Sequence, residues 1–393
     1  MAARRVFLIV LDGLGVGALP DAASFGDTGS NTLLHAAEAV GRLHVPNLAR
    51  LGLGNVQSAP GLAPVMPSVG SWGRMREAAA GKDTMVGHWE LLGVIAQQPL
   101  PTYPRGFPPE VLEGLRQRWN RGIIGNRPAS GTRIIEELGE EHLRTGALIV
   151  YTSADSVLQV AAHEAVVAPE QLYEYCRQAR EEMVGKHAVG RVIARPFVGR
   201  SGAFQRTAGR RDFSLPPPGP TVLDLAEGSS VRTVAVGKVA DILAHRGFNE
   251  EVAAAGNDAV AWQVIRLARE IEGPALVLAN LTDFDTLYGH RNDAVGLVSA
   301  LERFDTQLGE LLGALRRLDL LVLTADHGCD PTTPSTDHSR EYVPLLVVAG
   351  ERENGQALGE RETFADLGAT VADALGIEAP PAGTSFWESI VYD

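Results

Sequence analysis

The chain has 393 residues, of which 45% are hydrophobic and 21% are charged, with a formal net charge of -13 at pH 7. This length exceeds one average domain, and the composition supports a large buried core. The acidic balance argues against binding to nucleic acid or anionic membranes through bulk charge, and every apolar stretch is far shorter than the roughly 20 residues of a membrane helix.

The first predicted element is a strand near Val6, in the stretch VFLIVL. It ends at Asp12 without a small-residue cleavage site, so we interpret it as a strand rather than a signal peptide. Similar aliphatic runs follow near Ile149, Val234, Val277, Val322 and Val347. They alternate with helical patterns at Asp258 to Glu272 and Val295 to Leu315. This alternation predicts an α/β fold with a mostly parallel sheet, covered by helices on both faces.

The stretch GKDTMVGHWELLG contains the candidate nucleophile, Thr84, ahead of an expected helix from Met85 to Leu92. A hydroxyl at a helix start lies beside exposed backbone N–H groups and the positive end of the helix dipole, which would hold a phosphate. Asp83 or Thr84 can equally be a simple helix N-cap, so this alternative stays open.

The composition changes between about Gln97 and Pro218, where a second domain is predicted. Both ends are rich in proline, and the segment has 15 arginines and one lysine against 13 acidic residues. Its stretch from Gly185 to Arg211 has seven basic residues and no acidic one, which favours recognition of phosphate or carboxylate. We therefore expect a core of residues 1–96 and 219–393 with an inserted domain at 97–218.

Acidic residues follow three predicted strands at their carboxyl ends. They are, in chain order, Asp12, then Asp283 with Asp285, then Asp326 with His327. Ligands bind at the carboxyl ends of the strands in open α/β sheets, so we expect these clusters to meet at one edge. A single such aspartate is often a helix cap, but three together favour a common site.

Aspartate and histidine without cysteine form a ligand set suited to Mn²⁺ or Zn²⁺. In TADHGCDPTTPSTDHSR, a loop with proline and glycine separates Asp326-His327 from a second pair, Asp337-His338. In TDFDTLYGHRND, His290 follows a further aspartate, and spacing does not choose between Asp283 and Asp285. Together with Asp12, these residues could bind two divalent ions, a pair that activates a nucleophile and stabilises phosphoryl transfer.

The order of these residues resembles the alkaline phosphatase superfamily: Asp12-Gly, Lys82-Asp83-Thr84, Asp285 with His290, Asp326-His327, then His338. Within it, six stretches resemble the phosphopentomutase family: FLIVLDGLGVGALPDA, GKDTMVGHWELLG, GIIGNRPASGTRIIEELGEEH, IVYTSADSVLQVAAHE, GRVIARPFVG and NLTDFDTLYGHRND. These motifs extend over both predicted domains. The resemblance implies an alkaline-phosphatase-like core with an inserted, smaller α+β cap that recognises substrate and closes as a lid.

The resemblance also implies roles for single residues. One Mn²⁺ would be bound by Asp12, Asp326 and His327, and the other by Asp285, His290 and His338, with a phosphorylated Thr84 bridging them. Asp285 is preferred over Asp283 by this analogy alone. Asp337 would help to orient a ligating imidazole, and Cys329 would have no role. Ser153 and Asp155 would face the sugar, and Arg191, Arg206 and Lys238 its distal phosphate.

The activity implied is that of an isomerase that interconverts α-D-ribose 1-phosphate and ribose 5-phosphate, and the 2-deoxy sugars likewise. A sugar bisphosphate would prime Thr84. We expect small pentose phosphates as ligands, with no nucleic acid, membrane or obligate protein partner. The two cysteines imply no disulfide framework, which favours the cytoplasm. Two alternatives stay open: a hydrolase of the same superfamily, in which water attacks, and a non-catalytic metal-binding protein. A phosphoglycerate mutase would have serine in place of Thr84.

Overall fold

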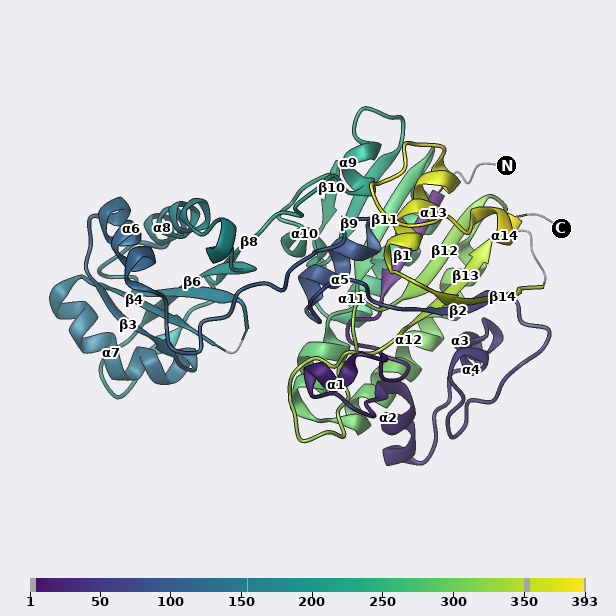
Figure 1. The fold of residues 1–393 in the computed structure, drawn as a ribbon, viewed down its shortest axis with the longest axis horizontal. Helices are drawn as coiled ribbons and strands as arrows, with labels where there is room; N and C mark the ends of the chain where they lie inside the picture. Colours follow the sequence, from purple (N-terminus) through teal and green to yellow (C-terminus); the bar gives the residue numbers. More distant parts are fainter. Residues whose placement is uncertain (1–4, 154, 350–353, 392–393) are drawn as a thin grey trace. The chain divides into compact units, whose positions relative to one another are not determined.

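The computed structural model describes residues 5–153, 155–349 and 354–391. The chain divides into two compact units, which we call unit 1 (Met1–Gln98 and Pro217–Asp393) and unit 2 (Pro99–Pro216). Each unit has a β-sheet with helices packed against it (Figure 1). Within the described ranges, no helix is both long enough and apolar enough to cross a membrane.

An eight-stranded sheet with the order β10-β9-β11-β1-β12-β13-β2-β14 forms the centre of unit 1. Its strands are β1 (Arg5–Val10), β2 (Ser71–Met75), β9 (Arg232–Val236), β10 (Glu250–Val252), β11 (Ala275–Asn280), β12 (Asp319–Thr324), β13 (Val343–Ala349) and β14 (Ala357–Arg361). Strands β10, β9, β11, β1 and β12 pair in parallel, whereas β13 runs antiparallel to both β12 and β2. The prediction of a mostly parallel α/β sheet is confirmed.

Strand β1 lies between β11 and β12, and its last residue, Val10, is opposite Asn280 and Thr324. All three strands are fully buried, as their continuous aliphatic sequences predict for strands covered on both faces. Because the three strands end at the same level, the residues that follow them emerge together at one edge of the sheet.

Two groups of helices cover this sheet (Figure 1). One comprises α2 (Thr32–Val40), α3 (Pro46–Arg50), α11 (Asn257–Glu270) and α12 (Ala294–Ala314), and the other α5 (Thr84–Leu91), α9 (Val222–Ala226), α10 (Val239–Ile242) and α13 (Ala365–Leu375). Shorter elements are α1 (Ala22–Phe25), α4 (Leu53–Val56), α14 (Trp387–Val391), η2 (Phe284–Tyr288) and η3 (Gly289–Arg291). The predicted helices at 258–272 and 295–315 correspond to α11 and α12.

Unit 2 has a six-stranded mixed sheet with the order β3-β4-β5-β6-β7, in which β8 also pairs with β6. Its elements are β3 (Ile123–Pro128), β4 (Leu148–Thr152), β5 (Val157–His163), β6 (Arg191–Val198), β7 (Gln205–Arg206), β8 (Arg211–Ser214), α6 (Pro109–Trp119), α7 (Gly131–Thr145), α8 (Pro169–Glu182) and the short η1 (Gly185–His187). Helices α6 and α8 share one apolar core with the sheet, whereas α7 forms a second, smaller core on the other face.

Candidate metal centre

Acidic and histidine side chains gather in unit 1 where β1, β11 and β12 end. Asp12 follows β1, Asp285 lies in η2 after β11, and Asp326 and His327 follow β12. The loop after β12 then folds back, because the backbones of Gly328 and Ser339 exchange two hydrogen bonds of 3.0 and 2.7 Å. This closure places His338 next to His327.

The first group consists of Asp12, Asp326 and His327, all buried. His327 Nε2 lies 3.5 Å from Asp12 Oδ1 and 3.4 Å from Asp326 Oδ2. The outer carboxylate oxygens are bound by the protein itself. Asn280 donates to Asp12 Oδ2 at 2.8 Å, and the Gly13 backbone N–H donates to Asp326 Oδ1 at 3.1 Å. The remaining oxygens therefore face the imidazole.

The second group consists of Asp285, His290 and His338. His290 Nε2 lies 3.1 Å from Asp285 Oδ2, and His338 Nε2 lies 3.6 Å from Asp285 Oδ1. The ring of His338 stacks on His290 at a centroid distance of 4.8 Å and on His327 at 3.8 Å. His338 thereby joins the second group to the first.

Asp283, the rival that spacing could not exclude, lies apart from both groups. Its carboxylate accepts a hydrogen bond of 2.8 Å from the backbone N–H of Asn257, and its own N–H donates to the Asn257 side chain at 2.9 Å. Asp283 thus connects the segment after β11 to the start of α11.

Each of the three imidazoles is oriented by a backbone carbonyl that accepts from its Nδ1. The acceptors are Gly328 for His327 at 3.0 Å, Thr336 for His290 at 2.6 Å and Lys82 for His338 at 3.0 Å. Such bonds select the tautomer with a free Nε2 lone pair. Asp337 instead accepts from the backbone N–H of His338 at 2.9 Å and lies 3.6 Å from Lys82 Nζ. The orienting contact expected of Asp337 is therefore made by the Lys82 carbonyl.

Four buried atoms in these groups have no hydrogen-bond partner in the described chain. They are Asp12 Oδ1, Asp285 Oδ1, Asp326 Oδ2 and His338 Nε2. An unpaired buried carboxylate oxygen is costly, and a divalent cation is the partner that satisfies several of them at once. The residues present therefore fit divalent ions. Ligand atoms lie within 4.8 Å of one another in Asp12, Asp326 and His327, and likewise in Asp285, His327 and His338.

The charges of the groups favour a cation as well. Burial raises the pKa of Asp12 well above its usual value, and the neighbouring Asp326 and Asp285 raise it further. Burial lowers the pKa of His327 to about 4, so this imidazole is neutral near pH 7 and can act as a ligand. Burial also disfavours charge on His338, but Asp285 outweighs it and raises the His338 pKa to about 9, so His338 must release a proton when its Nε2 binds a metal.

Cys329 Sγ also lies near Asp285 and His290, with all ligand atoms of this trio within 4.8 Å of one another. Burial raises the pKa of the Cys329 thiol, and Asp285 raises it further. The protonated thiol is a poor metal ligand. That Cys329 has no role stays a prediction.

Thr84 lies beside the first group, with its Oγ1 3.0 Å from His327 Nε2. Helix α5 begins at Thr84, and Asp83 is its N-cap, accepting from the backbone N–H groups of Met85 at 3.1 Å and Val86 at 3.2 Å. The helix N-cap is thus Asp83 and not Thr84, and the role of Thr84 as the nucleophile stays a prediction. The expectation that exposed N–H groups would hold a phosphate needs correction, because Asp83 already occupies these two.

Close backbone packing holds α5 against the loop after β12. A Cβ on Gly87 would lie 2.2 Å from the backbone oxygen of Asp326, so only glycine permits this approach. The buried His88 donates from Nδ1 to the Thr84 carbonyl at 2.8 Å, and the same atom lies 3.2 Å from Asp326 Oδ2. The sequence did not single out His88, although a histidine in a mostly apolar helix was a visible signal.

Arg340 fixes the segment that leads to Thr84 and was also not predicted. Its guanidinium donates to the carbonyl of Gly81 at 2.5 Å and to Glu77 Oε2 at 2.7 Å, and it contacts Asp21 at 3.0 Å. Arg340 lies two residues after His338, at the end of the loop that follows β12. The segment that precedes Thr84 and the loop that contains His338 are therefore connected through one buried side chain.

The predicted substrate residues lie in different parts of the chain. Ser153 and Asp155 occupy the turn between β4 and β5, where Asp155 N–H donates to Ser153 Oγ at 3.4 Å. Arg191 begins β6 beside this turn, and its guanidinium lies 3.8 Å from Asp212. Arg206 lies in β7 of unit 2, and Lys238 precedes α10 in unit 1. Unit 2 thus brings Ser153, Asp155 and Arg191 to one end of its sheet.

Comparison with known proteins adds to this geometry. Residues 4–379 match a family model described as the metalloenzyme superfamily. A phosphopentomutase of Caldanaerobacter subterraneus is 52% identical over 98% of this chain and 97% of its own length. A phosphopentomutase of Thermotoga maritima is 52% identical over 98% of this chain and 100% of its own. A solved phosphoglycerate mutase of Leishmania mexicana aligns with 98% of this chain and 97% of its own at 14% identity, with a TM-score of 0.48.

Proposed function

The chain belongs to the metalloenzyme superfamily and, within it, to the phosphopentomutases. From this premise, we propose that it interconverts α-D-ribose 1-phosphate and D-ribose 5-phosphate, and also the corresponding 2-deoxyribose phosphates. The chain is an isomerase that moves a phosphoryl group. We propose a phosphorylated Thr84 and a pentose bisphosphate as intermediates, with a sugar bisphosphate to prime the enzyme. Pentose phosphates are its proposed partners, and the cytoplasm its proposed location.

The single observation that carries this proposal is the position of Thr84 Oγ1, 3.0 Å from His327 Nε2 and beside buried carboxylates without hydrogen-bond partners. A hydroxyl in this environment is well placed to accept and return a phosphoryl group. A merely structural threonine at the first position of a helix would not need three aspartates and three histidines nearby.

The family depends on divalent metal, and we propose Mn²⁺ in two sites. Asp12, Asp326 and His327 would hold one ion, and Asp285, His290 and His338 the other. When bound, the ions supply positive charge that favours the threonine alkoxide and stabilises the phosphoryl oxygens in transfer. The donor set of carboxylates and imidazoles, without thiolate, suits Mn²⁺.

The protein's own residues hold the Thr84 hydroxyl in place for two phosphoryl transfers. In the first half, the bond between Thr84 Oγ1 and phosphorus breaks, a bond from the free sugar hydroxyl to phosphorus forms, and that hydroxyl's proton is released. In the second half, the bond between the other phosphate and its sugar oxygen breaks, that phosphate bonds to Thr84 Oγ1, and the sugar oxygen takes up a proton. His88 and Gly87 hold α5 in place, and Arg340 fixes the preceding segment, so the oxygen keeps its position throughout.

We propose that unit 2 is the cap that recognises the sugar and excludes water. Ser153 and Asp155 would contact the sugar, and Arg191 and Arg206, with Lys238 of unit 1, the phosphate that is not being transferred. A phosphoenzyme needs such exclusion, because water attack on phosphothreonine would release phosphate and leave the enzyme unprimed.

The test combines an activity assay with intact mass. Purified protein with Mn²⁺ and ribose 5-phosphate should form ribose 1-phosphate, and the active form should carry one added phosphoryl group that Thr84→Ala lacks. Thr286→Ala, an exposed threonine in η2, is the matched control and should keep both properties. Free phosphate as the main product would favour the hydrolase, and an equal mass increase in Thr84→Ala would refute the assignment of Thr84.

A further inference from the structure

Helix α5 of unit 1 contains a buried histidine, His88, whose two ring nitrogens have different surroundings. The exposed fraction of His88 is 1%, and its Nε2 atom has no hydrogen-bond partner in the described chain. Burial of an unpaired polar nitrogen costs stability. Packing alone therefore does not account for a histidine at this position, where an apolar side chain would fill the same space.

The other ring nitrogen of His88, Nδ1, lies between two oxygen atoms. The Thr84 carbonyl oxygen is 2.8 Å away, and Asp326 Oδ2 is 3.2 Å away. Because both neighbours are acceptors, Nδ1 carries the hydrogen. This hydrogen points to the nearer Thr84 carbonyl, since Asp326 Oδ2 makes no hydrogen bond within the described residues. One atom of His88 thus contacts both the residue that bears the proposed nucleophile and a proposed metal ligand.

These contacts close a circuit of four residues. Thr84 Oγ1 lies 3.0 Å from His327 Nε2, and that nitrogen lies 3.4 Å from Asp326 Oδ2. His88 then connects Asp326 Oδ2 back to the Thr84 carbonyl. On its other side, the Asp326 carboxylate accepts from the Gly13 backbone N–H at 3.1 Å. The separation between the Thr84 hydroxyl and the carboxylate of Asp326 is therefore fixed through the His88 ring.

The direction of the Nδ1–H bond suits a carboxylate that binds a cation. A hydrogen bond to Asp326 Oδ2 would take one of the lone pairs of that oxygen. The bond goes to the Thr84 carbonyl instead, while the positive end of the N–H dipole still attracts Oδ2 from 3.2 Å. His88 can thereby hold the carboxylate in place and leave its lone pairs to a metal ion.

His88 acts on a part of α5 that the other contacts of this helix do not fix. Gly87 permits close approach to the Asp326 backbone, which sets how near the helix lies. Glu90 holds the second turn, because its carboxylate accepts from two backbone N–H groups at 2.8 and 2.6 Å. His88 bonds to the first residue of the helix, Thr84, and so opposes rotation of the first turn.

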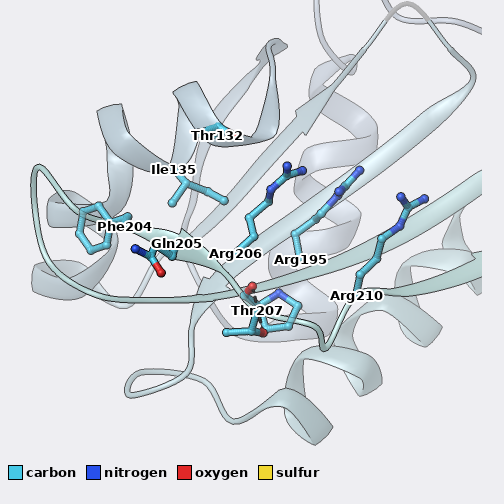
Figure 2. Close-up of a pocket in the computed structure, with 9 residues that line it drawn as sticks. Thr132, Ile135, Arg195, Phe204, Gln205, Arg206, Thr207 and Arg210 are labelled. Atoms are coloured by element: carbon cyan, nitrogen blue, oxygen red, sulfur yellow. Dashed lines mark hydrogen bonds between the residues drawn. The ribbon is translucent and has the colours of Figure 1, made fainter. Parts of the chain in front are cut away.

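We propose that His88 is a positioning residue that links the first group of metal ligands to the nucleophile. The affinity of Asp326 for its ion and the alignment of Thr84 Oγ1 would then depend on the same imidazole. His88 acts through these two residues, unlike Arg206, which lines the pocket of unit 2 in Figure 2 and is proposed to contact substrate itself. The assignment rests on the proposed function for the role of Thr84, whereas its effect on metal binding does not.

The test compares two substitutions that keep an amide N–H group in different places. The side-chain nitrogen of asparagine lies near the position of an imidazole Nδ1, and that of glutamine lies near the position of Nε2. His88→Asn can therefore still donate to the Thr84 carbonyl, whereas His88→Gln cannot. A purely structural role predicts the opposite order, because asparagine is smaller and leaves the larger gap in the core.

The first measurement is kcat and KM for ribose 5-phosphate, with full-length protein at saturating Mn²⁺. We expect His88→Gln to lower kcat about 100-fold and to change KM less than about twofold, because the hydroxyl of Thr84 is displaced. His88→Asn should stay within about fivefold of the wild-type kcat. His245→Gln, an exposed histidine that pairs with Asp241 and Glu251, is the matched control and should change neither constant.

The second measurement needs no turnover. Titration with Mn²⁺, followed by the electron paramagnetic resonance of the free ion, gives the dissociation constants of the two proposed ions. One of them should rise about tenfold or more in His88→Gln, and both should stay near the wild-type values in His88→Asn and His245→Gln. If the wild type forms no ribose 1-phosphate, the proposed function fails, and this titration alone decides the role of His88.

The proposal requires the predicted order in each measurement that can be made. His88→Asn as impaired as His88→Gln, or His88→Gln with wild-type kcat or wild-type Mn²⁺ affinity, overturns it. Melting temperatures show whether the variants fold. If His88→Gln does not fold, His88→Asn decides alone, and its failure to retain kcat and Mn²⁺ affinity, or to fold, overturns the proposal.

Discussion

At the scale of single residues, the chemistry of the candidate site follows from side chains placed directly after buried strands. That Asp12, Asp285 and Asp326 would meet could be predicted, because parallel strands end at a common edge. The groups that orient the histidines could not be predicted, because they are backbone carbonyls, and every residue has one.

The choice between Asp285 and Asp283 leads to a direct prediction. Asp285→Asn should lose one of the two proposed ions by elemental analysis, because its carboxylate lies between His290 and His338. Asp283→Asn should keep both ions and lose at most about 1 kcal/mol of stability, because its side chain accepts one hydrogen bond, from the Asn257 N–H. Metal loss in the Asp283 variant alone would reverse the assignment.

The buried His142 of α7 predicts a pH dependence in unit 2. Burial lowers its pKa below the usual 6.5, and its two ring nitrogens bond the Ala147 carbonyl at 2.7 Å and the His163 N–H at 2.8 Å. Below pH 6.5 the His142 side chain becomes protonated in the unfolded state but stays neutral in the folded state. The free energy of unfolding should therefore decrease as the pH falls through this value, and the contribution of His142 to it should be fully present above this value.

His142→Gln removes the titrating group and should show a smaller loss of stability between pH 8 and about pH 5.5 than the wild type. Urea unfolding followed by tryptophan fluorescence, to which Trp119 in α6 of the same unit contributes, measures this difference. Equal pH dependence in the two proteins would show that His142 does not contribute.

At the scale of helices and strands, apolar patterns located the buried elements well. The runs near Val6, Val277 and Val322 are β1, β11 and β12, and the expected helix from Met85 begins one residue earlier, at Thr84. The reversed direction of β13 was missed, because an apolar run looks the same in either direction. Strand β2 was missed because it is short, and its side chains alternate between buried and partly buried.

The close contact of α5 with the loop after β12 predicts a strong effect of one methyl group. Gly87→Ala should push the helix away from the Asp326 backbone and lower kcat about 100-fold, because Thr84 would shift from His327. Gly313→Ala, in α12 with nothing within 4 Å of the added Cβ, should leave kcat unchanged. Similar kinetics for the two variants would contradict this account of α5.

At the scale of the whole molecule, the two units have separate cores, and the candidate metal ligands all belong to unit 1. The change of composition at about Gln97 and Pro218 reflects this, because a separate core needs its own apolar residues and its own surface charge. Sequence alone could not show how each sheet is ordered, since β10, β9, β11, β1 and β12 are neighbours in an order unlike that of the chain.

Metal removal should therefore act on one unit. Because a bound ion stabilises only the structure that holds it, chelation should accelerate hydrogen exchange in β1, β11 and β12 by about 100-fold, if the metal had been present at about 100 times its dissociation constant. Exchange in β4 and β5 of unit 2 should stay the same. Mass spectrometry of peptides from the two sheets measures this, and uniform acceleration would contradict it.

The place of β1 between β11 and β12 also governs the order of events during synthesis. Strand β1 leaves the ribosome first, but its two neighbouring strands begin only at Ala275 and Asp319. Strand β1 therefore has no pairing partner while most of the polypeptide is synthesised. Unit 2, whose strands are all translated within one continuous stretch, can finish folding during that delay. The candidate metal centre, whose ligands extend from Asp12 to His338, can be assembled only near the end of translation.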